Sequence, residues 1–373
     1  MITLSKPYFD ECELAAVKET FDSGWVAGQG PKNEELSELI CQFTGSKFAI
    51  PVNNCTSGLH LALLAIGILP EDEVIVSDFT FPATGHSVMY CGAIPRFVDV
   101  SLSSYNILPD LIEEKINKKT KAIMVVHALG QMAEMNKIKE IAIKYNLFLI
   151  EDAACSLGAE YYGIKSGKFG DITAISFHAR KNVTSGEGGV VITDNEGFAA
   201  RIKSLSCFGM EPALTRQNEF SIPVFNQLGY NYKLSDINAS IAIEQLKKYN
   251  SILLKRYSMV AIYNSLFKHN PLIHIPQITE GAKHVYQTYA LLLDEKLNRN
   301  KLIMLMWENG IQTQIGTYSS FIQPVYKSKD TCPNSLRLYN STLALPLYHE
   351  LSEDNINFVA EALLNNINKI LKK

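Results

Sequence analysis

The chain has 373 residues, of which 47% are hydrophobic, and its formal net charge is −3. This length suffices for a large domain plus a smaller one, and the hydrophobic content supports a sizeable core. The charge balance excludes a basic surface, so we expect neither nucleic acid nor an anionic membrane as a partner. No apolar run approaches the ~20 residues of a membrane-spanning helix.

Cysteine usage and the first residues indicate the compartment. Seven cysteines are scattered singly, without a CxxC pair or the His/Cys spacing of a metal site. Residues 1–7 lack the apolar core of a signal peptide. We therefore expect reduced thiols, no metal site and a cytoplasmic protein.

The first 240 residues alternate between strand and helix patterns. A helix is expected over residues 10–21 and a turn-rich segment over 23–31. Apolar strand patterns then interleave with helix patterns (strands 48–52, 73–77, 96–100, 122–127 and 147–150; helices 59–68, 109–117 and 135–145). This alternation predicts an α/β fold with a mostly parallel sheet and helices on both faces.

The second part of the chain has a different pattern of predicted elements. A long helix is expected over residues 236–267, followed by a strand (286–293), a helix (298–309) and a terminal helix (353–371). Polar loops over 211–227 and 317–326 interrupt these elements. We place a domain change in the long helix, so the predicted domains are residues 1–240 and a small α+β domain of residues 241–373.

Lys181 is the first candidate catalytic residue. It follows an apolar strand pattern over 172–178 and precedes the turn Gly186-Glu187-Gly188-Gly189. A lysine held between two buried strands is suited to amine chemistry, including Schiff-base formation with an aldehyde. An isolated lysine in a glycine-rich hairpin is more often a surface residue, so the interpretation depends on the other polar residues.

Other chemistry-bearing residues also follow predicted strands. Thr56 and Ser57 precede a helix and are suited to its N-cap, where an anion can bind. Phe81 follows a strand as a possible stacking face, although core packing explains such an aromatic equally well. Asp152 ends an apolar run, where a carboxylate needs a positively charged partner. That partner could be a residue in a structural salt bridge or a protonated group of a ligand. Ligands of parallel sheets bind at the carboxyl ends of the strands, so we expect these side chains together.

Taken together, these residues meet the physical demands of pyridoxal phosphate (PLP). The aldehyde needs a lysine, the ring nitrogen an anion, the phosphate N–H groups and hydroxyls, and the ring a stacking face. No GxGxxG follows a strand, and the GEGG run lacks the Lys-Ser/Thr of a P-loop. The candidates are Lys181 for the aldehyde, Asp152 for the ring nitrogen, Thr56, Ser57 and Ser176 for the phosphate, and Phe81 for the ring.

Several blocks resemble the DegT/StrS family of PLP-dependent sugar-nucleotide aminotransferases. They cover nearly the whole chain in order and lie at residues 51–62, 79–84, 151–154, 176–189, 229–234 and 345–347. The resemblance implies a fold-type-I aminotransferase, with a seven-stranded, mostly parallel sheet in the large domain and a smaller C-terminal domain. It also implies a homodimer with active sites at the interface, in which Asn231 reaches the phosphate of the neighbouring subunit. Cys155 stands where many members have glutamine or histidine near the PLP 3-hydroxyl.

The resemblance also implies the reaction. L-glutamate would give its amino group to the cofactor, and a nucleotide-linked keto-sugar would then accept it, with Lys181 moving protons. We expect a 4-keto-6-deoxyhexose linked to dTDP, UDP or GDP, destined for surface polysaccharide such as the O-antigen of lipopolysaccharide.

Three alternatives stay open at this point. The enzyme could aminate a 3-keto-sugar. It could act on amino acids, which would require an arginine such as Arg337 or Arg216 for the substrate carboxylate. A catalytically silent regulatory protein on the same fold is disfavoured by intact Lys181, Asp152 and Ser57.

Overall fold

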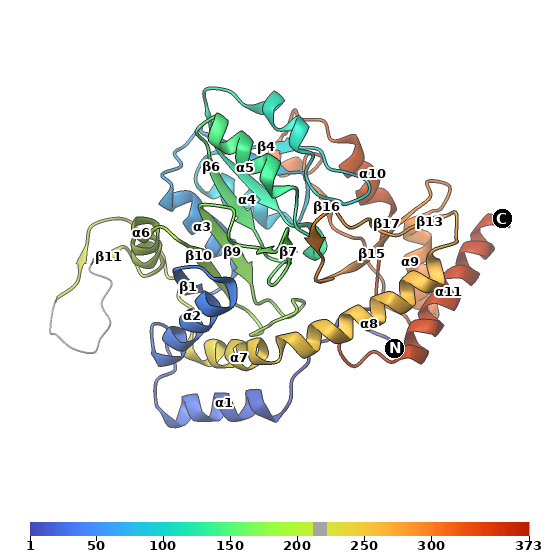
Figure 1. The fold of residues 1–373 in the computed structure, drawn as a ribbon, viewed down its shortest axis with the longest axis horizontal. Coiled ribbons are helices and arrows are strands. Elements are labelled where there is room, and N and C mark those ends of the chain that lie inside the picture. The colour runs from blue at the N-terminus through green and yellow to red at the C-terminus, as the bar shows by residue number, and fades with distance from the viewer. Residues whose placement is uncertain (212–221, 373) are drawn as a thin grey trace.

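A seven-stranded sheet forms the centre of the molecule in the computed structural model, which describes residues 1–211 and 222–372 (Figure 1). The strand order is β1-β10-β9-β6-β5-β2-β4. Neighbours from β9 to β4 pair in parallel, whereas β10 pairs antiparallel with both β9 and β1, so that β10 alone runs against the rest of this sheet. The strands are β1 (Phe48–Val52), β2 (Glu73–Ser77), β4 (Ile94–Val98), β5 (Thr120–Val126), β6 (Phe148–Asp152), β9 (Ile172–Ser176) and β10 (Gly189–Thr193). The predicted fold class is confirmed.

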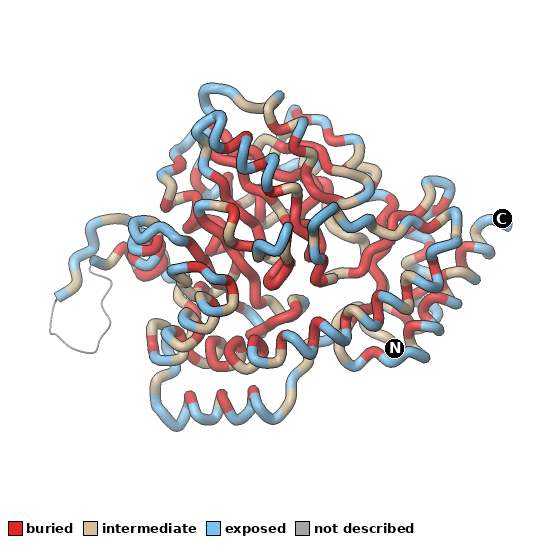
Figure 2. The backbone as a smooth tube through the Cα atoms, viewed as in Figure 1, coloured by how far each residue is buried: buried red, intermediate tan, exposed pale blue. Residues whose placement is uncertain are grey.

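Helices cover both faces of this sheet because alternate strand residues point to opposite sides. On one face, Ile75 joins a buried cluster that also contains residues of α2, α5 and α7. On the other, Val74 and Val76 pack with residues of α3, α4 and α6. The buried core therefore continues through the sheet, as Figure 2 shows. The helices are α1 (Glu11–Asp22), α2 (Pro31–Thr44), α3 (Cys55–Ala65), α4 (Ala83–Tyr90), α5 (Met135–Lys144), α6 (Glu196–Ser206) and α7 (Asp236–Lys247).

The C-terminal part has its own core. Strands β13 (Ile273–His274), β15 (Tyr289–Leu293) and β17 (Thr342–Leu345) form an antiparallel sheet, which packs with α8 (Tyr249–Phe267), α9 (Arg299–Glu308) and α11 (Glu353–Leu371). The chain's first residues join this part, since the Ile2 amide donates to Gly310 O (2.8 Å), and both termini lie on this side of Figure 1. The division at residue 240 falls inside α7 and stays a prediction.

The remaining elements are short. They are β3 (Phe79–Thr80), β7 (Glu160–Tyr161), β8 (Ile164–Lys165), β11 (Met210–Glu211), β12 (Val224–Phe225), β14 (Ala282–Lys283), β16 (Tyr318–Ser319) and α10 (Pro333–Ser341). Strand β16 pairs with β3, which joins the C-terminal part to the edge of the large domain. Strands β11 and β12 pair with each other and extend from the body beside α6 (Figure 1). Most of the predicted polar loop between them, residues 212–221, lies outside the described residues.

Several expected elements differ from the structure. Residues 109–117 form two 3₁₀ turns, because the segment becomes extended at Ile116 and is too short to nucleate an α-helix. The long helix divides at Lys248 into α7 and α8. The strand expected from residue 286 begins at Tyr289, since Tyr286 has a left-handed backbone (φ 45°). Helix α3 begins at Cys55 and is capped by Asn54, not by Thr56 or Ser57.

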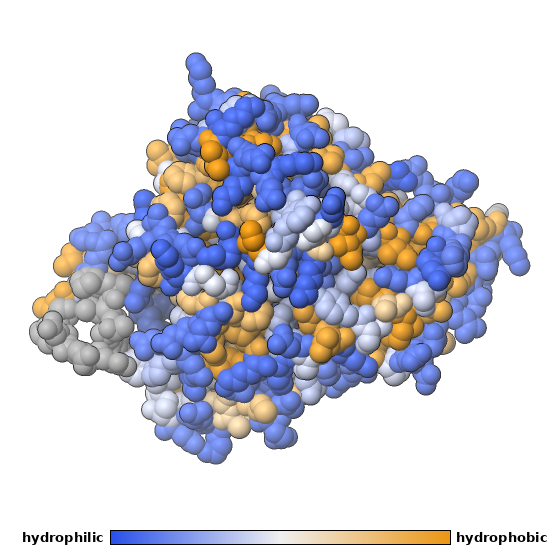
Figure 3. All heavy atoms as spheres, in the orientation of Figure 1, coloured by the Kyte–Doolittle hydropathy of each residue, from blue (hydrophilic) through white to orange (hydrophobic). Residues whose placement is uncertain are grey.

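None of the described helices has both the length and the apolar character needed to cross a membrane. The face shown in Figure 3 carries mostly hydrophilic residues, with small apolar groups between them.

Candidate active site

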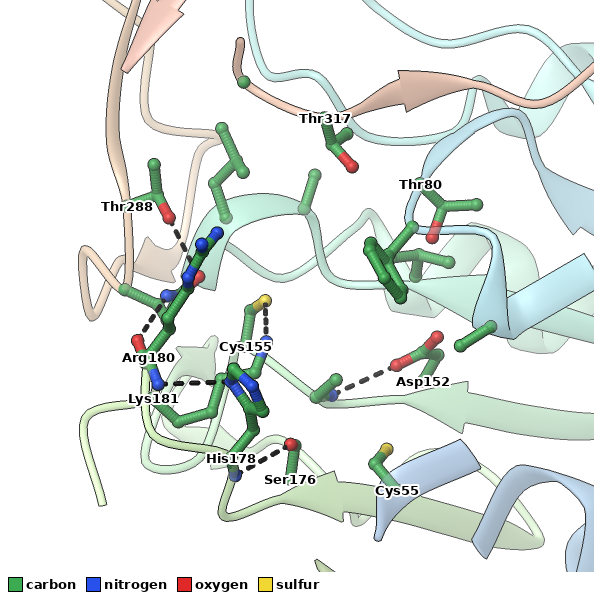
Figure 4. Close-up of a pocket in the computed structure, with 18 of the residues that line it drawn as sticks. Cys55, Thr80, Asp152, Cys155, Ser176, His178, Arg180, Lys181, Thr288 and Thr317 are labelled. Atoms are coloured by element: carbon green, nitrogen blue, oxygen red, sulfur yellow. Dashed lines mark hydrogen bonds between the residues drawn. The ribbon is translucent and has the colours of Figure 1, made fainter. Parts of the chain in front are cut away.

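A cavity of about 640 Å³ opens at the carboxyl ends of the parallel strands. The last residues of β5, β6 and β9 (Val126, Asp152 and Ser176) all line it, as expected for a sheet of this type. Residues from the C-terminal part close its other side, among them Gln287, Thr288 and residues 314–318. Figure 4 shows the polar side chains of both parts directed toward the shared space.

Lys181 lies in the loop between β9 and β10, where its amide donates to His178 O (2.8 Å). Its Nζ lies 3.1 Å from Cys155 Sγ (Figure 4). Burial alone would lower the pKa of Lys181, but Cys155, Cys55 and Asp152 favour the ammonium form and the net pKa is raised. The Lys181 amine is therefore buried in direct contact with Cys155.

Asp152 is a buried carboxylate without an ion-pair partner among the described residues. Thr84 Oγ1 donates to its Oδ2 (2.8 Å), and the Ala154 amide donates to its Oδ1 (3.1 Å). Burial raises the pKa of Asp152 in spite of these hydrogen bonds. A cation placed in the cavity would reverse that shift, so this carboxylate fits a protonated ring nitrogen.

The start of α3 forms another wall. The cap Asn54 accepts from the Ser57 amide through Oδ1 (2.8 Å), and Thr56 lines the cavity. Ser57 lines an adjoining cavity of about 450 Å³ that shares Asn54 and Thr56 with the first. Across the space, Ser176 Oγ accepts from the His178 amide (3.2 Å) and retains its own hydroxyl proton for a ligand. Hydroxyls at a helix N-terminus fit a phosphate.

Close backbone packing places that helix end beside the lysine loop. A Cβ at Gly189 would lie 2.7 Å from Ile175 O and 2.8 Å from Cys55 N. Only glycine leaves room for both contacts. The first residue of β10 thus sets how near α3 comes to the strand that leads to Lys181.

Phe79 and the predicted stacking residue Phe81 have different places. Both line the cavity, but Phe79 is 1% exposed and belongs to a hydrophobic core cluster, whereas Phe81 is 64% exposed. The Phe81 ring meets Tyr318 edge to face, with centroids 6.1 Å apart. Phe81 is therefore available to cover a flat ring, and Phe79 is not.

Asn231 lies apart from the other candidates. It is exposed, bridges Cys207 through the backbone, and its Oδ1 accepts from Lys233 Nζ. Neither cavity described above includes Asn231 in its lining. Its role toward a second subunit stays a prediction.

A model of the DegT/DnrJ/EryC1/StrS aminotransferase family matches residues 7–364. The chain belongs to this family.

Relatives of known sequence support this assignment over the whole length. The uncharacterized protein MJ1066 of Methanocaldococcus jannaschii is 38% identical over 96% of this chain and 95% of its own. The spore coat polysaccharide biosynthesis protein SpsC of Bacillus subtilis is 34% identical over the same shares.

Solved structures of aminotransferases share the fold of this chain, and one of them is known in PLP and PMP forms. Helicobacter pylori PseC, an aminotransferase involved in the biosynthesis of pseudaminic acid, superposes with a TM-score of 0.92 at 25% identity, over 99% of both chains. Spr1654 of Streptococcus pneumoniae has a TM-score of 0.91 at 26% identity, over 98% of both chains in its PLP form and over 99% and 98% in its PMP form. The family and these neighbours support a sugar aminotransferase, and the unpaired Asp152 and the hydroxyls at α3 fit PLP.

Sequence reasoning missed part of this DegT/DnrJ/EryC1/StrS site. Arg180, Gln287 and Gln314 line the cavity, yet they come from distant segments. Arg180 could have been found from its place next to Lys181. Arg337, considered for a substrate carboxylate, instead pairs with Glu295 (2.8 Å) and lines another cavity, and Arg216 lies outside the described residues.

Proposed function

We propose that this chain is a PLP-dependent aminotransferase that moves an amino group from L-glutamate to a nucleotide-linked keto-sugar in the cytoplasm. The preferred acceptor is a 4-keto-6-deoxyhexose linked to dTDP, UDP or GDP, and the product serves surface polysaccharide such as O-antigen. The carrying observation is that the Lys181 amine and the unpaired Asp152 carboxylate face one cavity, beside the start of α3. Family membership and the polysaccharide role in the name of SpsC support the substrate class.

Bound PLP supplies an aldehyde and a ring that takes up electrons. This chain's residues would bind and direct it. The Asp152 carboxylate would hold a proton on the ring nitrogen, Phe81 would cover the ring, and Thr56, Ser57 and Ser176 would hold the phosphate. Lys181 would bind the aldehyde and would move the reacting proton at its Nζ.

We also propose a homodimer in which Asn231 completes the site of the neighbouring subunit. Asn231 is exposed and lies outside the cavity of its own chain. Phe81 lines the cavity and is yet 64% exposed, so a second copy would cover apolar surface there. Light scattering of wild type and of Asn231→Ala, combined with PLP titration, tests this. Dimers with weakened PLP binding in the variant are expected, and monomeric wild type contradicts the proposal.

The experiment that tests the activity is an absorbance spectrum of purified protein with PLP, before and after L-glutamate. We expect a visible band that glutamate removes. Lys181→Ala should lack this response, whereas Lys203→Ala, at an exposed position of α6, should retain it. Absence of a band in wild type would refute PLP dependence, and a band that glutamate leaves unchanged would refute the donor.

A panel of acceptors then decides the substrate. Protein already converted by glutamate is mixed with 4-keto and 3-keto nucleotide sugars and with plain keto acids. Return of the visible band with the 4-keto sugars is expected. Return with only the 3-keto sugars would correct the ketone position, and return with only keto acids would identify an enzyme of amino acids.

A further inference from the structure

Arg180 is a cation at the cavity mouth for which the described residues provide no carboxylate. Its Nη1 donates to the neutral amide oxygen of Gln314 (3.2 Å). By contrast, Arg96 pairs with Glu73 and Asp330, and Arg337 pairs with Glu295. The side chain of Arg180 is exposed and lines the cavity. A guanidinium with several N–H donors left over is suited to hold an anion.

Neutral residues of the C-terminal part hold Arg180 in this place. Gln287 Nε2 donates to the Arg180 carbonyl (2.8 Å), and Thr288 Oγ1 donates to Gln287 Oε1 (3.0 Å). Together with Gln314 they fix both the backbone and the side chain of Arg180. None of these partners neutralises its charge. The mouth is therefore preorganised around one positive group.

The other charged residues in the described lining of the cavity do not pair with Arg180, so its guanidinium can bind a substrate. The carboxylates of the lining are Asp152, which is bonded to Thr84 and the Ala154 amide, and Glu187, which lies 3.7 Å from His178. Lys181 is taken up by the cofactor under the proposed function. Arg180 is then the remaining lysine or arginine of the described lining, and thus a cation available to an anionic substrate.

We infer that Arg180 binds the side-chain carboxylate of the amino donor and thereby selects a dicarboxylic amino acid. Figure 4 shows the Arg180 side chain directed toward Thr288, away from the contact between Lys181 and Cys155. The α-carboxylate of a donor sits on the carbon that bears the reacting amine, whereas the side-chain carboxylate of glutamate lies farther out. A cation displaced from the Lys181 amine therefore suits the side-chain group. This inference rests on the proposed function.

Two donors of nearly equal shape test it. Single-turnover loss of the visible band is followed with L-glutamate and with its neutral analogue L-glutamine, in wild type and in Arg180→Gln. We expect the variant to lose 10- to 100-fold in the rate constant per unit glutamate, and less than threefold with glutamine. Arg180→Lys keeps the positive charge but lacks the planar guanidinium. Its rate constant with glutamate should therefore lie between those of wild type and Arg180→Gln. Arg201→Gln, which removes an exposed arginine of α6, should match wild type on both donors.

The outcomes separate the two proposals. If wild type reacts with neither glutamate nor glutamine, the proposed function itself is refuted. A reactive wild type, with Arg180→Gln equal to it or impaired to the same degree on both donors, refutes the inference alone. A loss confined to the keto-sugar half-reaction would assign Arg180 to the nucleotide phosphates and would also refute the inference. The melting temperature and the PLP band of each variant report its folding, and Arg180→Lys gives an independent reading if Arg180→Gln does not fold.

Discussion

The inner end of the cavity and its mouth are built in different ways. At the inner end, Asp152 and Ser176 are the last residues of adjacent parallel strands, and Lys181 follows in the next loop. At the mouth, Arg180 meets Gln287 and Gln314, which lie more than 100 residues away in the chain. The first group lies at strand ends and in the loop that follows them, whereas the second depends on side-chain contacts between the two parts of the chain.

This difference separates chemistry from selection. The sheet fixes the residues that face the cofactor, because neighbouring parallel strands end at one edge. The mouth depends on loops and on the C-terminal part, which can change without disturbing the sheet. We therefore expect substitutions at the inner end to slow the reaction with every donor, and substitutions at the mouth to change the choice among donors.

The largest expected effect is that of Asp152→Asn. Under the proposed function this change removes the carboxylate assigned to the ring nitrogen, so it should slow the glutamate half-reaction by about 10²–10³-fold, measured by stopped-flow absorbance. Thr84→Val removes a hydrogen bond to Asp152 but keeps the charge, so it should cost about 10-fold. A rate constant of Asp152→Asn within threefold of the wild-type value would show that the glutamate half-reaction does not depend on this charge.

A smaller effect is expected from Gly189→Ala. The new Cβ would press against Ile175 O and Cys55 N, so unfolding in urea should show a loss of about 1–3 kcal/mol. Because α3 must move, PLP affinity should fall as well. Gly45, unlike Gly189, has a left-handed backbone (φ +79°), but the space around it is open, so Gly45→Ala should cost about 1 kcal/mol with unchanged PLP affinity. Equal PLP affinity in wild type, Gly189→Ala and Gly45→Ala would contradict the conclusion that Gly189 sets the position of α3.

The last prediction concerns pH and the residues beside the mouth. Burial lowers the pKa of His284 to about 3, and its ring stacks on Tyr286, next to Gln287. The unfolded chain binds a proton near pH 6.5 and the folded chain does not, so stability is full above that pH and is lost as the pH falls toward 3. This histidine contributes a slope of at most about 1.4 kcal/mol per pH unit.

Urea unfolding between pH 7 and pH 4 measures that slope. His284→Asn should flatten it, while His274→Asn, at an exposed position of β13, should not. An unchanged slope in His284→Asn would show that His284 does not account for the loss of protein stability in acid.

Sequence and structure contributed differently to the two ends. The alternation of strands and helices determined the α/β class, and the residues after each strand located Lys181, Asp152, Thr56 and Ser176, because a parallel sheet brings strand ends together whatever their separation in sequence. The sequence identified Phe81 as the stacking candidate but could not exclude core packing, because the pattern does not report burial. Its exposure of 64% in the structure decides against core packing.

The sequence by itself determined the family and the fold class, and it predicted the residues that would face the cofactor. The tertiary structure alone decided that Asn54 caps α3, that the Lys181 amine contacts Cys155, and that Arg180 faces Gln314 rather than a carboxylate. The physical reason is distance along the chain. Strand ends obey a local rule of sheet geometry, whereas contacts between a loop of the large domain and the C-terminal part follow from packing that no local pattern records.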